Sequence, residues 1–390
     1  MNFSSLSLWT TLLATLCFCP LINAHAQAAP TRQSYNFVVS TQTIGASYGF
    51  TKEDRLVETA REILKMGSNT LKFDLPRDKV GDASPASLTD VAQNNPAVKT
   101  VLALPFAHVL MWAYPVKSAE EEVASPQNLD ANYRELYDLT RYLLMNFRGS
   151  GKTFYLGNWE GDWHLLHTNP DYVPTSDEVK NMTAWVNIRQ KAVDDAKRDT
   201  PHEGVNVFHY LEVNRVQDAI AGKTRLANAV LPQTNVDFVS YSSYDSLSDI
   251  EKQLPAALDF LQSRLALKAG ISGKRVWIGE YGFPSNGNSP VQQDEKSRRV
   301  MSAALKWGCP FVLYWEFYNN EVNDGKQVGF WLVNDKNEKQ PIYFTHQKFL
   351  AWAREFVTNF QENKGRLPTR DEFSAQAAIW LADSPPIAAK

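Results

Sequence analysis

Two glutamates follow short apolar runs and stand among amides, glycines and aromatic rings. Glu160 ends the stretch LGNWE (156–160), and Glu280 ends the stretch VWIGE (276–280). Two carboxyl groups in unlike environments can share the cleavage of an acetal, because one delivers a proton to the leaving oxygen while the other faces the oxocarbenium-like carbon. Aromatic faces stack on sugar rings, and amides hold hydroxyls. These residues predict carbohydrate chemistry, with Glu160 and Glu280 as the catalytic pair.

Further polar and aromatic side chains follow other predicted strands. We expect these to bind the substrate: Lys72, Asp74, Asn158, Trp163, Glu212, Tyr244 and Trp315. Glu212 and Asp162 are also alternatives to Glu160 as the acid/base. His108 and His209 fall near predicted strand ends, where they would hold substrate hydroxyls or belong to the core.

The sequence gives no sign of a metal or a cofactor. None of the seven His residues forms a His-Glu-x-x-His pattern, so we expect no catalytic metal. No Gly-x-Ser-x-Gly segment occurs, which argues against a serine esterase. We expect chemistry that uses side chains alone, with no cofactor.

The elements that must position these residues alternate along the chain from about residue 35. Eight predicted strands span residues 35–40, 70–75, 100–105, 153–158, 205–210, 236–241, 275–280 and 310–315. Helical patterns cover 52–66, 132–145, 176–198, 250–267, 292–307 and 346–360. This order predicts an α/β fold, a single-domain (β/α)8 TIM barrel with its active site at the C-terminal ends of the strands. A doubly wound sheet is the competing architecture, but no Gly-rich phosphate turn follows the first strand.

Three regions are expected along the chain. Residues 1–26 are predicted to be an export signal, because Leu6 to Ile22 is mostly apolar and small residues follow at 24–28. The catalytic barrel would occupy 30–365, and 366–390 would form a C-terminal helix and tail that pack on it. Cys17 and Cys19 lie in the signal, so the mature chain would keep only Cys309 and no internal disulfide. We expect an exported monomer, periplasmic or extracellular.

Charge and hydropathy exclude some partners. The chain has 40 basic and 43 acidic side chains, a formal net charge of −3 and no basic run, so we do not expect it to bind nucleic acid. The N-terminal apolar run contains Pro20 and is shorter than the roughly 20 continuous apolar residues of a spanning helix. We therefore expect no stable membrane insertion.

The motifs and their order resemble the large clan of retaining β-glycosidases on (β/α)8 barrels, which includes many cellulases, mannanases and β-xylosidases. In that clan the acid/base Glu ends strand four, usually just after an Asn, and the nucleophile ends strand seven, often within Gly-Glu-Tyr/Phe-Gly. The resemblance implies that Glu160 is the acid/base and Glu280 the nucleophile. It also implies that Trp315 floors the subsite of the reacting sugar and that Tyr244 hydrogen-bonds the nucleophile.

The chain departs from the clan at two places. Trp159 separates Asn158 from Glu160, and strand two carries Lys72 and Asp74 where the clan commonly has Arg. Two other functions therefore stay open. One is a non-catalytic barrel that binds carbohydrate, and the other is an α-specific glycosidase that uses Glu160 with Glu212.

Overall fold

The computed structural model describes residues 31–77, 84–116 and 125–384. In these residues eight parallel strands close into a barrel in chain order, with β8 paired to β1. The strands are β1 Val39–Thr43, β2 Thr70–Asp74, β3 His108–Trp112, β4 Thr153–Gly157, β5 Asn206–Val213, β6 Phe238–Ser242, β7 Val276–Tyr281 and β8 Val312–Tyr314. The predicted (β/α)8 barrel is confirmed. The expected export signal, residues 1–26, lies outside the described residues.

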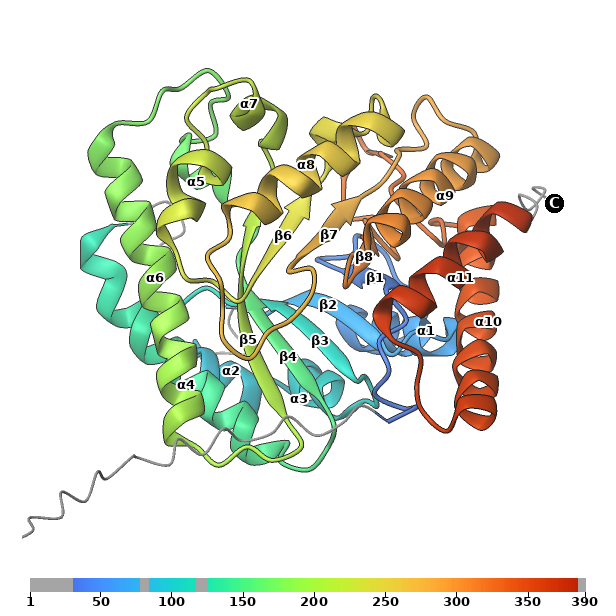
Figure 1. Ribbon diagram of the computed structural model, residues 1–390, viewed down its shortest axis with the longest axis horizontal. Helices are drawn as coiled ribbons and strands as arrows, with labels where there is room; N and C mark the ends of the chain where they lie inside the picture. Colours follow the sequence, from blue (N-terminus) through green and yellow to red (C-terminus); the bar gives the residue numbers. More distant parts are fainter. Residues whose placement is uncertain (1–30, 78–83, 117–124, 385–390) are drawn as a thin grey trace, which may run out of the picture.

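Helices surround the barrel, as Figure 1 shows. They are α1 Arg55–Met66, α2 Leu88–Asn94, α3 Pro96–Ala103, α4 Leu129–Asn146, α5 Gly161–Leu165, α6 Ser176–Asp199, α7 Val216–Ile220, α8 Ile250–Arg264, α9 Pro290–Trp307, α10 Pro341–Lys364 and α11 Arg370–Asp383. The short helices α5 and α7 follow β4 and β5 directly, at the C-terminal ends of those strands. A small hairpin, β9 Val322–Asn323 and β10 Lys326–Gln327, follows β8. The last helix, α11, packs against α9 and α10.

The third strand was predicted in the wrong place. Residues 100–105 belong largely to α3, whose first turn is capped by the side chain of Asn95 and begins with Pro96. An Asn cap followed by Pro at the first helical position is a helix start, and it outweighs the β-branched residues that follow. The strand itself is β3, so Trp112 rather than Pro105 marks its C-terminal end.

The barrel interior is built in layers. Five aromatic rings pack together near its N-terminal end, contributed by Tyr155, Phe208, Phe238, Trp277 and Phe311. Nearer the C-terminal end of the barrel the buried interior becomes polar, with Gln42, Lys72, Glu212 and Ser240. The aromatic layer excludes water from below, so the polar layer above it sits in a low-dielectric setting.

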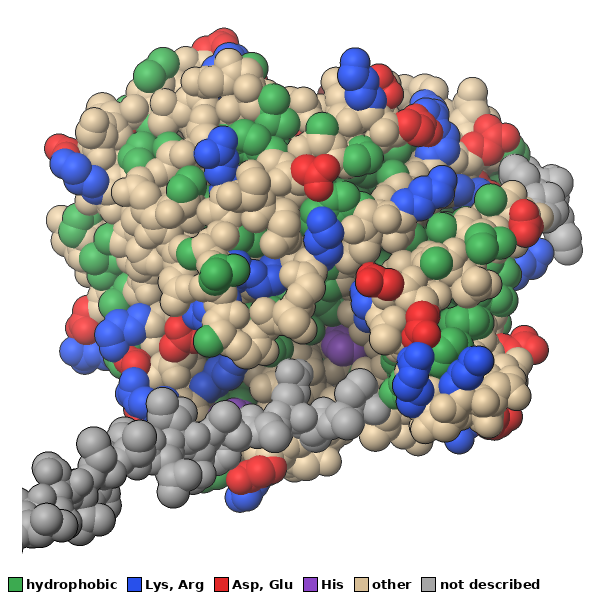
Figure 2. Space-filling model, in the orientation of Figure 1, with side chains coloured by type: hydrophobic (Ala, Val, Ile, Leu, Met, Phe, Trp, Pro, Cys, Tyr) green, Lys and Arg blue, Asp and Glu red, His purple; other side chains and the backbone are tan. Residues whose placement is uncertain are grey.

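The surface carries charges of both signs. Figure 2 shows Lys and Arg interspersed with Asp and Glu over the described part of the visible face. On that part of the face no field of one sign is present to attract a polyanion. In the described ranges no helix has the length and apolar character needed to cross a lipid bilayer.

Arg189 of α6 ties together the ends of two strands. Its side chain is fully buried, and Nη2 donates to the carbonyl oxygens of Ala113 (3.0 Å) and Gly157 (2.9 Å). Nη1 donates to Asn132 Oδ1 at 3.1 Å. Ala113 directly follows β3 and Gly157 ends β4. The Arg189 guanidinium therefore holds the C-terminal ends of these two strands together, just before residues 158–160.

We expect Arg189→Met to lower the free energy of unfolding by about 3 kcal/mol, because it removes buried hydrogen bonds to the carbonyl oxygens of Ala113 and Gly157 and to Asn132 Oδ1. Urea unfolding of the purified protein measures the change. Arg134→Met on α4 is the matched control, since Arg134 is exposed and pairs with the exposed Asp130, so its loss changes stability by less than about 1 kcal/mol. Equal losses in both variants would contradict the role of Arg189.

Candidate active site

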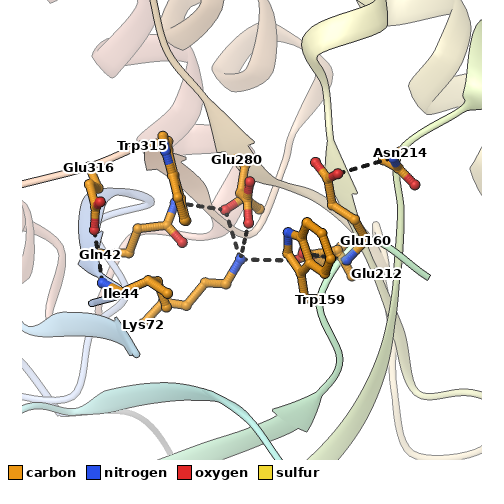
Figure 3. Close-up of polar contacts among 12 residues, drawn as sticks. Gln42, Ile44, Lys72, Trp159, Glu160, Glu212, Asn214, Glu280, Trp315 and Glu316 are labelled. Carbon is orange, nitrogen blue, oxygen red and sulfur yellow. Dashed lines mark hydrogen bonds and ion pairs between the residues drawn. The ribbon is translucent and has the colours of Figure 1, made fainter. Parts of the chain in front are cut away.

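Lys72 is a fully buried ammonium in the middle of the barrel. Its Nζ lies 2.9 Å from Glu212 Oε2 and 3.2 Å from Glu280 Oε1, and it donates to the carbonyl oxygen of Gly279 at 3.3 Å. Nζ is also 4.7 Å from the centroid of the Trp112 ring. Figure 3 shows the side chain reaching from β2 toward both carboxylates. Burial disfavours the charged amine, but Glu212 and Glu280 together raise the pKa of Lys72, so the group stays cationic.

Glu212 lies inside the barrel on β5 and is fully occupied by protein contacts. Its Oε2 accepts hydrogen bonds from Lys72 Nζ and from Ser240 Oγ, the latter at 2.7 Å. Its Oε1 accepts from the backbone N–H of Glu160 at 3.2 Å. The side chain has no exposed surface. Glu212 therefore orients Lys72 and the backbone of Glu160.

Glu280 reaches the same ammonium through an irregularity in β7. The register with the neighbouring strands shifts between Tyr241 and Ser242 and between Ile278 and Tyr281. A Cβ on Gly279 would come within 1.8 Å of Ser240 Oγ and 3.0 Å of Glu212 Oε2, so glycine is required there. Burial raises the pKa of Glu280 well above its ordinary value, and the Lys72 ammonium opposes that rise.

Glu160 carries a second carboxyl group with a different environment. Its Oε2 accepts hydrogen bonds from Trp163 Nε1 (2.6 Å) and Asn214 Nδ2 (3.1 Å), and no Lys or Arg contacts it among the described residues. Burial, followed by the negative charge of Glu212, raises the pKa of Glu160 to about 7. Glu160 is thus suited to hold a proton near neutral pH, whereas Glu280 is paired with a cation.

Asn158 and Asp162, on either side of Glu160, are engaged by backbone groups. The amide of Asn158 accepts from Glu212 N (3.2 Å) and donates to Glu212 O (3.3 Å). Asp162 accepts from the backbone N–H groups of Asn214, Arg215 and Leu226 at 2.8–3.3 Å. Both side chains are fully buried. They fasten the loop after β4 to the loop after β5.

Aromatic side chains from three strand ends line the site. Trp112 lies between Trp159 and Trp315, with ring centroids 6.4 Å and 6.3 Å away. Trp159 is 38 % exposed, whereas Trp112 and Trp315 are buried. Trp315 Nε1 donates to Glu321 Oε1 at 3.0 Å, which fixes that ring against the loop after β8. The inserted Trp159 thus joins an aromatic wall beside the carboxyl groups.

Two other predicted residues, Tyr244 and Asp74, lie at the same end of the barrel, as does Glu316. Tyr244 is close enough to the two candidate carboxylates that burial and the charges of Glu280 and Glu160 raise its pKa well above 10. Within the described residues its hydroxyl makes no hydrogen bond to Glu280. Asp74 ends β2, in register with Trp112. Glu316 is fully buried and accepts from Ile44 N at 2.8 Å, a structural contact.

The two histidines near predicted strand ends lie away from the site. His108 begins β3, and its Nε2 contacts the backbone oxygen of Ser34 at the N-terminal end of the barrel. His209 is buried against Arg189 and Gln190. A core role therefore replaces a substrate role for both. The described residues contain no cluster of His, Cys, Asp and Glu that would hold a metal ion.

Sequence reasoning missed three residues that build the site, namely Trp112, Asn214 and Ser240. Trp112 ends the apolar run VLMW (109–112), which was placed in a loop because the strand was assigned to residues 100–105. Correct recognition of the Asn95 cap would have moved the strand and exposed this signal. The sequence around Asn214 and Ser240 has no local signature of a site residue. Their hydrogen-bond partners, Glu160 and Glu212, come from other strands or the loops that follow them.

Comparisons with known proteins bear on the fold. No protein-family model and no curated protein matches the chain. Among solved structures, a GH5_18 protein from Streptomyces cattleya in complex with Manβ1-4GlcNAc is 10 % identical, with 88 % of each chain covered and a TM-score of 0.56. A GH5_18 from Bifidobacterium longum subsp. infantis is 12 % identical, covering 80 % of this chain and 79 % of that one, with a TM-score of 0.55.

A third similar structure is the exo-β-1,4-mannosidase Op5Man5 from Opitutaceae bacterium strain TAV5. It is 12 % identical, with 82 % of this chain and 60 % of that chain covered and a TM-score of 0.56. At these identities the likeness establishes a shared barrel fold.

We expect Lys72→Met to lower the free energy of unfolding at pH 7 by about 3–5 kcal/mol, because it leaves two buried carboxylates without their cationic partner. The double variant Lys72→Met/Glu212→Gln loses less free energy of unfolding than the sum of the two single variants, since one of the unpaired carboxylates is removed as well. Chemical denaturation of the four proteins in this double-mutant cycle measures the coupling. Additive losses would show that Lys72 and Glu212 do not interact.

Proposed function

We propose that the protein is a glycoside hydrolase that cleaves β-linked poly- or oligosaccharides with retention of configuration. The observation that carries this proposal is the unlike setting of two carboxyl groups at the C-terminal end of the barrel. Glu280 contacts the Lys72 ammonium, and Glu160 is buried against uncharged N–H donors. One group is suited to act as an anion and the other as an acid.

Glu280 takes the role of nucleophile. The ammonium of Lys72 stabilises its carboxylate at 3.2 Å. The charge of an ionised Glu160 raises the pKa of Glu280, so a proton on Glu160 favours the ionised nucleophile. Attack of the Glu280 carboxylate on the anomeric carbon forms the glycosyl ester as the glycosidic bond breaks.

Glu160 takes the role of acid and then of base. Its proton passes to the glycosidic oxygen as the leaving group departs, and the resulting carboxylate then takes a proton from water. That water attacks the anomeric carbon and releases the sugar from Glu280. The aromatic wall of Trp112, Trp159 and Trp315 supports this function, since such faces stack on the C–H surfaces of sugar rings.

The alternative acids have no free carboxylate oxygen to offer. Glu212 is held by Lys72, Ser240 and the backbone of Glu160, and Asp162 accepts three backbone N–H groups. Use of either group would require breaking these buried hydrogen bonds. This argues against an α-specific enzyme that pairs Glu160 with Glu212.

Neighbouring folds suggest which glycosides to test first. One similar structure is named as an exo-β-1,4-mannosidase, and another holds Manβ1-4GlcNAc. A panel of β-mannosides, β-glucosides and β-xylosides, each as aryl glycoside and as oligosaccharide, therefore covers the proposed substrates. Binding without product release across the panel would favour a non-catalytic carbohydrate-binding barrel instead.

We also propose that the protein is exported and acts in the periplasm or outside the cell. The support is the apolar run from Leu6 to Ile22 followed by small residues. N-terminal sequencing of the protein recovered from its native compartment tests this, with a start near residue 27 expected. An intact N-terminus on cytoplasmic protein would contradict it.

We expect Glu280→Ala to lose at least about 10⁴-fold in kcat on aryl β-glycosides, because no covalent intermediate can form. Azide restores turnover of an activated glycoside in this variant by filling the vacated space. The product is the α-glycosyl azide, which NMR spectroscopy identifies.

Glu160→Ala is the matched comparison. It still forms the intermediate from an activated glycoside, and azide then gives the β-glycosyl azide, because attack occurs on the intermediate. Full activity of Glu280→Ala, or the same azide anomer from both variants, would contradict the two assigned roles.

The pH dependence of kcat/KM is expected to fall above about pH 7. The general acid must be protonated in the free enzyme, and burial with the charge of Glu212 raises the pKa of Glu160 to about 7. Rates on an unactivated β-glycoside between pH 4 and pH 9 measure this limb. In Glu160→Gln, measured on an activated substrate, kcat/KM should no longer fall above about pH 7. If the fall persists in this variant, the titrating group is not Glu160.

A further inference from the structure

Two N–H donors reach the same oxygen of the Glu160 carboxyl group. Trp163 Nε1 and Asn214 Nδ2 both approach Oε2, at 2.6 Å and 3.1 Å. Neither of these N–H donors reaches Oε1, and the hydroxyl of Ser242 on β6 is a further polar neighbour that lowers the pKa of the carboxyl group. Glu160 as a whole residue is 8 % exposed. Figure 3 shows the carboxyl turned toward Asn214 and away from Lys72.

The chemistry of the indole determines what Oε2 can do. An indole N–H is only a donor, so the oxygen 2.6 Å from Trp163 Nε1 must be an acceptor. A carboxyl oxygen that already bears a proton is a poor acceptor for two N–H groups. The proton of the acid form therefore belongs on Oε1.

Each donor is restrained by further contacts. Asp162 directly precedes Trp163 and accepts the backbone N–H of Asn214 at 3.0 Å. The backbone N–H of Trp163 also donates to the carbonyl oxygen of Glu160 at 3.0 Å, at the start of α5. The Arg215 guanidinium lies 5.5 Å from the centroid of the Trp163 ring. The indole is thus restrained on its backbone and on one face.

We propose that Trp163, supported by Asn214, is a positioning residue that keeps the proton of Glu160 on Oε1 and stabilises the carboxylate once that proton has left. The inference rests on the proposed role of Glu160 as acid/base. A hydrogen bond to an ionised acceptor is stronger than one to a neutral acceptor, so the donors favour the deprotonation that accompanies bond cleavage. They act through Glu160 without changing the nucleophile.

Several groups on neighbouring elements also influence the ionisation of Glu160. They are Glu212 on β5, Lys72 on β2, Ser242 on β6, Glu280 on β7, and Tyr244 in the turn after β6. None of them is altered when the indole N–H alone is removed. Trp163→Phe keeps the aromatic ring and deletes the donor, so it isolates the proposed effect.

The test measures the pKa of Glu160 in the full chain by ¹³C NMR of labelled glutamate carboxyls, assigned by comparison with Glu160→Gln. In Trp163→Phe we expect this pKa to rise by roughly one unit, since one donor to the ionised form is lost. Trp307→Phe is the control, because Trp307 Nε1 likewise donates to a carboxylate, Asp259, at 2.8 Å on the outside of the barrel. It should leave the pKa of Glu160 unchanged.

Kinetics provides the second readout. Trp163→Phe should lower kcat/KM roughly tenfold or more for glycosides with poor leaving groups, which need the proton, and less than about threefold for activated aryl glycosides. Equal losses on both classes would indicate a merely structural or sugar-binding role and overturn the inference. An unchanged pKa of Glu160 would also overturn the inference about Trp163. The proposed hydrolysis with retention of configuration would not be affected by that result.

A wild-type protein that cleaves no glycoside would refute the proposed function, and the NMR comparison then decides the inference about Trp163 alone. If Trp163→Phe does not fold, Asn214→Leu removes the other donor and is held to the same two measurements. An upward shift of the Glu160 pKa supports the inference in either variant, and no shift contradicts it.

Discussion

A buried ammonium needs compensating charge, and this requirement on Lys72 organises the centre of the barrel. Two carboxylates approach Nζ within 3.2 Å, one from β5 and one from β7, so the cation connects three strands. With both carboxyl groups ionised, the cluster of Lys72, Glu212 and Glu280 carries one net negative charge. Removal of Lys72 would leave two carboxylates unpaired in a low-dielectric interior, and the free-energy cost would far exceed that of losing a surface pair.

This pairing also separates the two carboxyl groups that could do chemistry. Glu280 shares the cation with Glu212, whereas Glu160 contacts only neutral donors and lies near the negative charge of Glu212. Glu212 therefore acts on both sides, because it anchors the lysine beside one carboxylate and raises the pKa of the other. A residue without exposed surface thus shapes the site through its charge and its hydrogen bonds.

Much of the fold and part of the site could be predicted from the sequence, because the relevant signals are local. Alternating strands and helices predicted the barrel, and the segment around Glu280 carries its own glycine and aromatic neighbours. The third strand differs from the prediction for a local reason, since the Asn95 cap and Pro96 begin a helix where a strand is predicted. Hydrogen bonds between the ends of neighbouring strands have no local signal in the sequence. Asn214, Ser240 and the bulge that turns Glu280 toward Lys72 depend on register between strands, which composition and spacing do not encode.

The single residue between Asn158 and Glu160 shows how such contacts can be redistributed. In the clan that the motifs resemble, an Asn directly precedes the acid/base. Here Asn158 is turned into the protein, where its amide satisfies the backbone of Glu212. The amide beside Glu160 comes instead from Asn214, after the next strand, and Asp162 holds that residue by its backbone. The insertion therefore shifts one donor to a neighbouring loop, adds the half-exposed Trp159 to the aromatic wall, and leaves a carboxyl group at the end of β4.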